Sequence, residues 1–160
     1  MIDTTEGSMA WLATLDSEQK KRYFDEFTRQ WSHFQLLKDE DLVILKGHLL
    51  VEEQLWIMVS SKLKSPEEIK RFSFSQVFSL ARAMYDLPDD LPWLWGAIRK
   101  LNKLRNLSSH QLLPDDYELH KEGFLSSVPI QDTKDGMNRL KETITAVYFG
   151  CQWFTLFGKS

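Results

Sequence analysis

The chain has 160 residues and a formal net charge of −3, a length that suits a single domain over residues 1–160 and a charge that excludes a surface basic all round. Apolar residues make up 42% of the sequence, which excludes a disordered chain, and a single cysteine excludes an intrachain disulfide framework. No apolar run approaches the roughly 20 residues of a membrane span, and a secretory signal is not recognisable, so we expect a cytoplasmic protein whose residues 1–14 form a polar tail.

Two long amphipathic helices are predicted for the first part of the chain. Aromatic residues that recur every three or four positions predict a helix over residues 16–36, and a second periodic pattern predicts a helix over residues 40–63. Glu52 and Glu53 interrupt the apolar stripe of the second helix, where a carboxylate would favour an arginine partner. His48 is expected at the boundary of that stripe. The stripe consists of Leu42, Leu45, Leu49, Trp56, Val59 and Leu63.

The rest of the chain is predicted to add three helices, over residues 73–86, 91–109 and 134–157. Ser65 and the proline that follows it signal a break and a new helix start. Residues 111–132 carry turn signals and few periodic apolar positions, so we expect a loop there. No pair of strands is recognisable, and the fold class expected is therefore all-α, an antiparallel bundle of about five helices.

An arginine, an amide and a histidine come together near the end of the helix predicted over residues 91–109. Arg105 continues the apolar stripe of this helix, so a cation stands where a core or partner-facing residue is expected. Asn106 and His110 are four residues apart and share a face, whereas Arg105 and His110 diverge by roughly 140° on a straight helix. They converge on one ligand only if the helix loosens before His110 or if two copies of the chain combine their motifs.

The sequence from Arg105 to His110, Arg-Asn-Leu-Ser-Ser-His, resembles the Arg-x4-6-His motif of HEPN domains, which are the helical domains of many prokaryotic toxin and defence ribonucleases. The resemblance implies a HEPN-like bundle and metal-independent cleavage of RNA without a cofactor. It also implies a symmetric homodimer in which two Arg105/His110 pairs line one cleft. A toxin or antiviral effector of this kind would be restrained by an inhibitory protein partner.

In such a ribonuclease a ribose 2′-hydroxyl attacks the adjacent phosphate, and negative charge grows on the nonbridging oxygens. A histidine is suited to moving the proton and an arginine to holding the phosphate oxygens, which are the roles expected of His110 and Arg105. Asn106 is expected to orient the histidine or to bind phosphate.

Further residues are expected to support this site. The carboxylate that orients the arginine is expected to be Glu53 rather than Glu52, and Arg99 and Lys103 supply a local basic strip for RNA. Ser109 adjoins the histidine and is expected to support it. A Ser/His/Asp triad is disfavoured because this serine follows a predicted helix and not a strand.

An alternative from a different class of protein remains open. The chain could be a noncatalytic helical interaction module, either a HEPN-like scaffold or an immunity- or antitoxin-type protein. Arg105 and His110 would then form a structural polar cluster with Glu52 or Glu53, and the aromatic stripes would bind another protein. Neither interpretation needs a metal, since the sequence has no cysteine pair and no histidine spacing typical of a zinc site.

Overall fold

The computed structural model describes residues 16–109, 114–131 and 135–157, and within these ranges the chain forms helices and no strand. The expected all-α class is confirmed. None of the helices in these ranges combines the length and the apolar character that crossing a bilayer requires. The helices are α2 (Ser17–Gln35), α3 (Glu40–Ser60), the short 3-10 helix η2 (Pro66–Ile69), α4 (Phe74–Met84), α5 (Leu94–Ser108), α6 (Tyr117–Ser126) and α7 (Gly136–Phe157).

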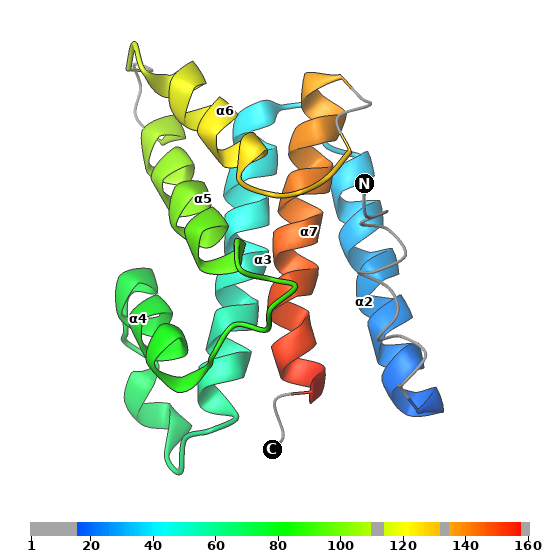
Figure 1. Cartoon of the computed structure of the whole chain (residues 1–160), viewed down its shortest axis with the longest axis vertical. Helices are drawn as coiled ribbons and strands as arrows, with labels where there is room; N and C mark the ends of the chain where they lie inside the picture. Colours follow the sequence, from blue (N-terminus) through cyan, green and yellow to red (C-terminus); the bar gives the residue numbers. More distant parts are fainter. Residues whose placement is uncertain (1–15, 110–113, 132–134, 158–160) are drawn as a thin grey trace.

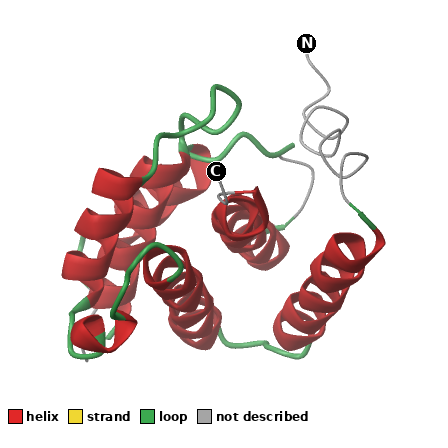
Figure 2. Cartoon of the chain, turned by 90° about the horizontal axis from the view of Figure 1, so that it is seen from below, coloured by secondary structure: helices red, strands yellow, loops and turns green. Residues whose placement is uncertain are grey.

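The four longest helices form an antiparallel bundle. In Figure 1, α2 and α5 run in one direction, whereas α3 and α7 run in the other. The helix α3 lies at the centre, packed against α4, α5 and α7, and the view along the bundle in Figure 2 places α7 between α2 and the α4–α5 side. The motif helix α5 is therefore held from one side by the central helix.

Side-chain caps explain why the helix starts were predictable. Asp16 and Gln19 form a capping box at the start of α2, and Asp39 accepts a hydrogen bond from a backbone amide in the first turn of α3. Ser73 and Gln76 form a second capping box at the start of α4. Each cap satisfies amides that have no partner inside the helix, so these three starts agree with the predicted ones to within a residue.

Two glycines allow helices to approach one another closely. A Cβ added at Gly47 of α3 would lie 2.5 Å from Ile144 Cγ2 on α7 and 3.1 Å from Phe34 Cζ on α2. A Cβ added at Gly150 of α7 would lie 2.8 Å from a methyl group of Leu94 on α5. At these two positions the helices therefore pack at a distance that only a residue without a side chain permits.

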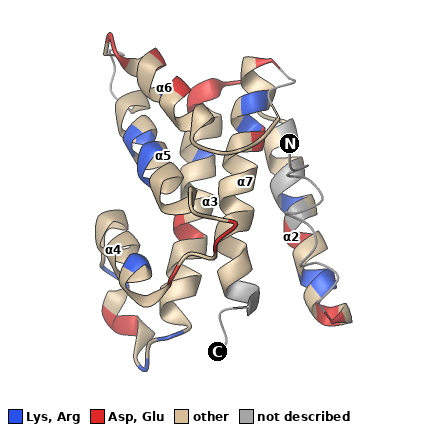
Figure 3. Ribbon diagram, viewed as in Figure 1, with Lys and Arg blue, Asp and Glu red and all other residues tan. Residues whose placement is uncertain are grey.

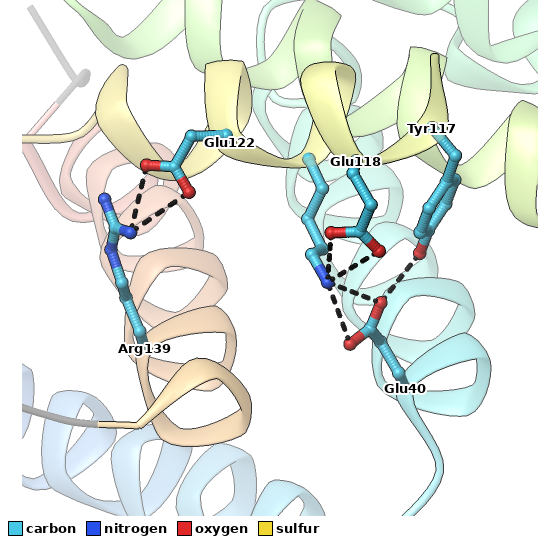
Figure 4. Close-up of polar contacts among 6 residues, drawn as sticks. Glu40, Tyr117, Glu118, Glu122 and Arg139 are labelled. Atoms are coloured by element: carbon cyan, nitrogen blue, oxygen red, sulfur yellow. Dashed lines mark hydrogen bonds and ion pairs between the residues drawn. The ribbon is translucent and has the colours of Figure 1, made fainter. Parts of the chain in front are cut away.

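The expected loop over residues 111–132 is wrong for its central part, which forms α6. This helix buries Tyr117 and Phe124. Between them Lys121 faces Glu40 at the start of α3, with its Nζ 3.2 Å from the Glu40 Oε1 (Figure 4). A lysine therefore occupies a position on the inner face of the helix, and it interrupts the apolar period that would have indicated a helix.

The predicted core stripe of α3 is wrong in its first half. Leu42, Leu45 and Leu49 are 43%, 38% and 51% exposed. Apolar residues occur almost all round α3, so their spacing does not determine which side of the helix faces the core. The side that does face the core carries Val43, Ile44, Gly47, His48, Val51, Gln54, Leu55, Met58 and Val59.

Candidate functional site

Arg105 and Asn106 lie in the last turn of α5 and are joined side chain to side chain. Arg105 Nη1 donates a hydrogen bond of 3.0 Å to Asn106 Oδ1. The Nε of the same guanidinium is buried and has no hydrogen-bond partner among the described residues. Arg105 is thus half-buried, and its Nη1 is held by Asn106.

The two serines before His110 close the end of α5. Ser108 Oγ donates to the carbonyl oxygen of Arg105 at 3.1 Å, and Ser109 Oγ donates to that of Asn106 at 2.9 Å. The carbonyl of Arg105 also accepts the backbone N–H of Ser109 at 3.2 Å, so the two hydroxyls add hydrogen bonds to carbonyls in the last turn of the helix. Ser109 therefore supports the motif by holding its backbone. His110 lies outside the described residues, so its approach to Arg105 stays a prediction.

The predicted pairing of Glu53 with Arg105 is wrong. Glu53 lies on the side of α3 that faces α2, where its Oε2 is 3.5 Å from Arg29 Nη2. Arg29 makes a shorter contact of 2.8 Å with Glu26 on its own helix. Neighbouring residues of a helix point roughly 100° apart, so Glu52, and not Glu53, points toward the α5 side, where it approaches His48.

A buried histidine underlies the motif helix and was not among the predicted site residues. His48 is only 2% exposed, so its expected place at the boundary of the apolar stripe is wrong. Its Nε2 donates to Asn102 Oδ1 on α5 at 3.0 Å, and its ring packs on Phe74 of α4 with centroids 4.5 Å apart. His48 and Asn102 therefore tie the central helix to the motif helix one turn before Arg105.

The imidazole of His48 is uncharged at neutral pH. Burial lowers its pKa to about 4, the hydrogen bond to Asn102 opposes the shift, and the positive charge of Arg105 adds to it. The 3.8 Å approach of Nδ1 to Glu52 Oε2 is consequently no ion pair at neutral pH. Arg105 follows Asn102 by three residues on α5, so the two residues lie on neighbouring positions of the same side of that helix.

The outer side of α5 is basic. Arg99 and Lys103 are exposed, and together with Asn106 they occupy positions i, i+4 and i+7, which lie within roughly 60° on a helix. Figure 3 shows this run of basic residues along α5. The carboxylate of Asp116, at the start of α6, lies 2.9 Å from His120 of that helix. The basic strip thus leads along α5 to the Arg105–Asn106 pair.

The described residues hold no cluster of histidine, cysteine or carboxylate side chains that could bind a metal ion.

No family model, curated protein or solved structure matches this chain. The resemblance to HEPN domains therefore stands on the motif and its helical setting. Of the predicted site residues, Arg99, Lys103, Arg105 and Asn106 lie on α5, and Ser109 is the residue directly after its end. Glu52 lies on the side of α3 that faces α5, and Glu53 does not. The sequence signal for the missed His48 was its spacing of four residues from Glu52.

Proposed function

We propose that this chain is a metal-independent endoribonuclease of the HEPN type that acts in the cytoplasm as a homodimer. The observation that carries the proposal is the Arg105–Asn106 hydrogen bond of 3.0 Å at the end of α5, which orients a permanently charged guanidinium next to the position where the chain continues to His110. Because the Nε of this guanidinium is buried, its terminal nitrogens are the ones that would bind phosphate oxygens.

The proposed reaction needs one proton acceptor and one cation. His110 removes the proton of a ribose 2′-hydroxyl, the oxygen attacks the adjacent phosphorus, and the bond to the 5′ oxygen of the next nucleotide breaks. The products are a 2′,3′-cyclic phosphate and a 5′-hydroxyl, whose proton comes from a general acid such as a protonated histidine. Arg105 stabilises the charge on the nonbridging oxygens.

Asn106 and the basic strip have complementary roles in the proposal. Because Asn106 Oδ1 accepts from Arg105, its amide Nδ2 is left to donate to His110 or to a phosphate oxygen. Arg99 and Lys103 lie on the same side of α5 and are exposed, so they would contact phosphates further along the RNA. Binding through these contacts would weaken as salt is raised.

The test is cleavage of RNA by the full chain in the presence of a metal chelator. We expect fragments that end in a cyclic phosphate, and we expect His110→Ala and Arg105→Ala each to lower the rate by at least about a hundredfold. Arg22→Ala is the matched control, because Arg22 is 69% exposed on α2, on the other side of the bundle. Wild type without cleavage, or His110→Ala as active as Arg22→Ala, would refute the ribonuclease.

A toxin or defence role follows from the same proposal at the level of the cell. Expression of the wild type is expected to arrest growth, expression of His110→Ala is not, and an inhibitory protein partner would restore growth.

A noncatalytic interaction module is the second candidate, and the exposed leucines of α3 favour it. Leu42, Leu45 and Leu49 leave an apolar stripe exposed on α3. In this case Arg105 is structural, so that Arg105→Ala lowers the melting temperature while the wild type cleaves no RNA. That combination of results would leave the binding module as the function.

A further inference from the structure

One side of the central helix carries an unusual share of the apolar surface. Of the large apolar side chains that are exposed in the described ranges, Leu42, Leu45, Leu49 and Ile57 all lie on α3. The other helices show such residues singly or not at all, as with Phe24 on α2 and Leu119 on α6. Several exposed apolar side chains on one helix side mark an interaction surface more often than scattered single ones do.

This surface has a regular pattern of apolar and charged residues. We define the α3 face as Leu42, Lys46, Leu49, Glu53 and Ile57, whose spacings of four, three, four and four residues keep them within roughly 80° of one another. Lys46 has no carboxylate partner in the described part of the chain, and the contact of Glu53 with Arg29 is long, at 3.5 Å. The face therefore alternates apolar side chains with a half-buried lysine and with a glutamate whose contact with Arg29 is long.

The pattern is complementary to itself. Lys46 and Glu53 are equally distant in sequence from the midpoint between Leu49 and Leu50, and Leu42 and Ile57 are equally distant from the same point. If two copies of α3 lie antiparallel about an axis through this midpoint, each lysine meets the other copy's glutamate. Each Leu42 then meets the other copy's Ile57. A twofold interface has this property, that residue i contacts residue j and j contacts i.

We propose that the α3 face binds the α3 face of a second copy of this chain, antiparallel, with the twofold axis near Leu49. This names the contact surface of the homodimer in the proposed function, and to that extent it rests on that proposal. His48, which joins α3 to Asn102 of α5 at 3.0 Å, lies roughly 140° around α3 from the middle of this face, so α5 lies outside the contact between the two α3 helices.

The experiment reverses the sign of one charged residue of the face at a time. We expect sedimentation velocity over a concentration series to show a wild-type dimer. Lys46→Glu alone sets like charges against each other twice, and so does Glu53→Lys alone, so each should raise the dissociation constant roughly tenfold or more. An equimolar mixture of the two variants restores both opposite-charge contacts, and it should form heterodimers about as tight as the wild type.

The mixture distinguishes a broken interface from a disturbed fold. A variant can instead dimerise weakly because its own fold is disturbed, for example through loss of the Glu53–Arg29 contact. Mixing it with the other variant does not then restore dimerisation. A mixture that associates no more tightly than its components overturns the proposal, as does a wild type that stays monomeric over the whole series. An apolar test with a matched control is Leu49→Glu, expected to be monomeric, against Leu119→Glu, expected to dimerise, since Leu119 is 73% exposed on α6.

Cleavage of RNA measured on the same samples keeps the two proposals apart. A wild type that pairs through α3 but cleaves nothing refutes the ribonuclease and leaves the α3 interface in place. A wild type that cleaves RNA as a monomer refutes the α3 interface and leaves the ribonuclease.

Discussion

His48 is a residue whose chemistry depends strongly on its surroundings. It is buried between α3, α4 and α5, and its Nε2 is taken by Asn102. Its Nδ1 is buried without a hydrogen-bond partner in the described ranges. Glu52 approaches from its own helix and Arg105 from α5. The neutral ring therefore joins α3 to α5 through Asn102 and keeps one lone pair unused.

Acid is expected to unfold the protein through this histidine. Burial lowers the folded pKa of His48 from 6.5 to about 4, so the unfolded chain binds the proton first and stability falls as the pH drops through this interval. The loss is on the order of 3 kcal/mol for one group, since each pKa unit corresponds to about 1.4 kcal/mol. Urea unfolding at a series of pH values measures it.

His48→Gln is the matched variant, because its amide can donate to Asn102 and does not titrate. Its stability between pH 6.5 and pH 4 should vary less with pH than that of the wild type. Equal slopes for the two proteins would contradict the assignment of this loss to His48.

At the scale of single residues, the half-buried position of Arg105 on α5 could be predicted from the sequence, but the residues around it could not. Arg105 was predictable because a cation prolonged an apolar stripe. The choice of Glu53 over Glu52 failed because neighbouring helix positions point roughly 100° apart, and only the three-dimensional arrangement shows that α2 lies on one side of α3 and α5 on the other.

At the scale of elements, α6 is held over the start of α3 by polar contacts on its inner face. Tyr117 Oη donates to Glu40 Oε1 at 2.9 Å, and Lys121 Nζ lies 3.2 Å from the same oxygen. Glu118 adds a contact of 3.1 Å to Lys121, and α7 contributes Arg139, 3.0 Å from Glu122 (Figure 4). Glu40 is therefore the acceptor on which two α6 side chains converge.

Glu40→Ala is expected to loosen α6. It leaves the buried hydroxyl of Tyr117 without its acceptor and Lys121 without one of its two carboxylates, which should cost about 1–3 kcal/mol. Hydrogen exchange of the α6 amides should accelerate more than that of α3 or α7. The matched control is Glu118→Ala, since Glu118 is 75% exposed and such a pair contributes at most about 1 kcal/mol. Equal effects of both substitutions would contradict the role given to Glu40.

The helix starts that the sequence predicted to within a residue are those with a capping side chain. The starts of α2, α3 and α4 each carry a capping side chain, which is a local signal. Two predictions failed for non-local reasons. The helix α6 was missed because Lys121 pairs with a residue far away in the sequence, and the buried side of α3 was misjudged because α3 is apolar almost all round.

At the scale of the whole molecule, three helices meet at Gly47. The Cβ of an alanine there would lie 2.5 Å from Ile144 Cγ2 and 3.1 Å from Phe34 Cζ, so α7 and α2 would both have to give way. The packing of α2 and α7 against the central helix at this point thus depends on the absence of a side chain at Gly47.

Gly47→Ala is expected to destabilise the fold by about 1–3 kcal/mol, because overpacking in a close-packed core outweighs the helix propensity gained. Gly96→Ala is the matched control. Gly96 lies inside α5, and a Cβ there meets nothing within 4 Å, so the same substitution should stabilise by roughly 0.5–1 kcal/mol. Urea unfolding of the two variants should therefore move the midpoint in opposite directions. If both variants gained stability, α2 and α7 could not be packed on α3 at Gly47, and the bundle that presents the motif helix would have to be arranged differently.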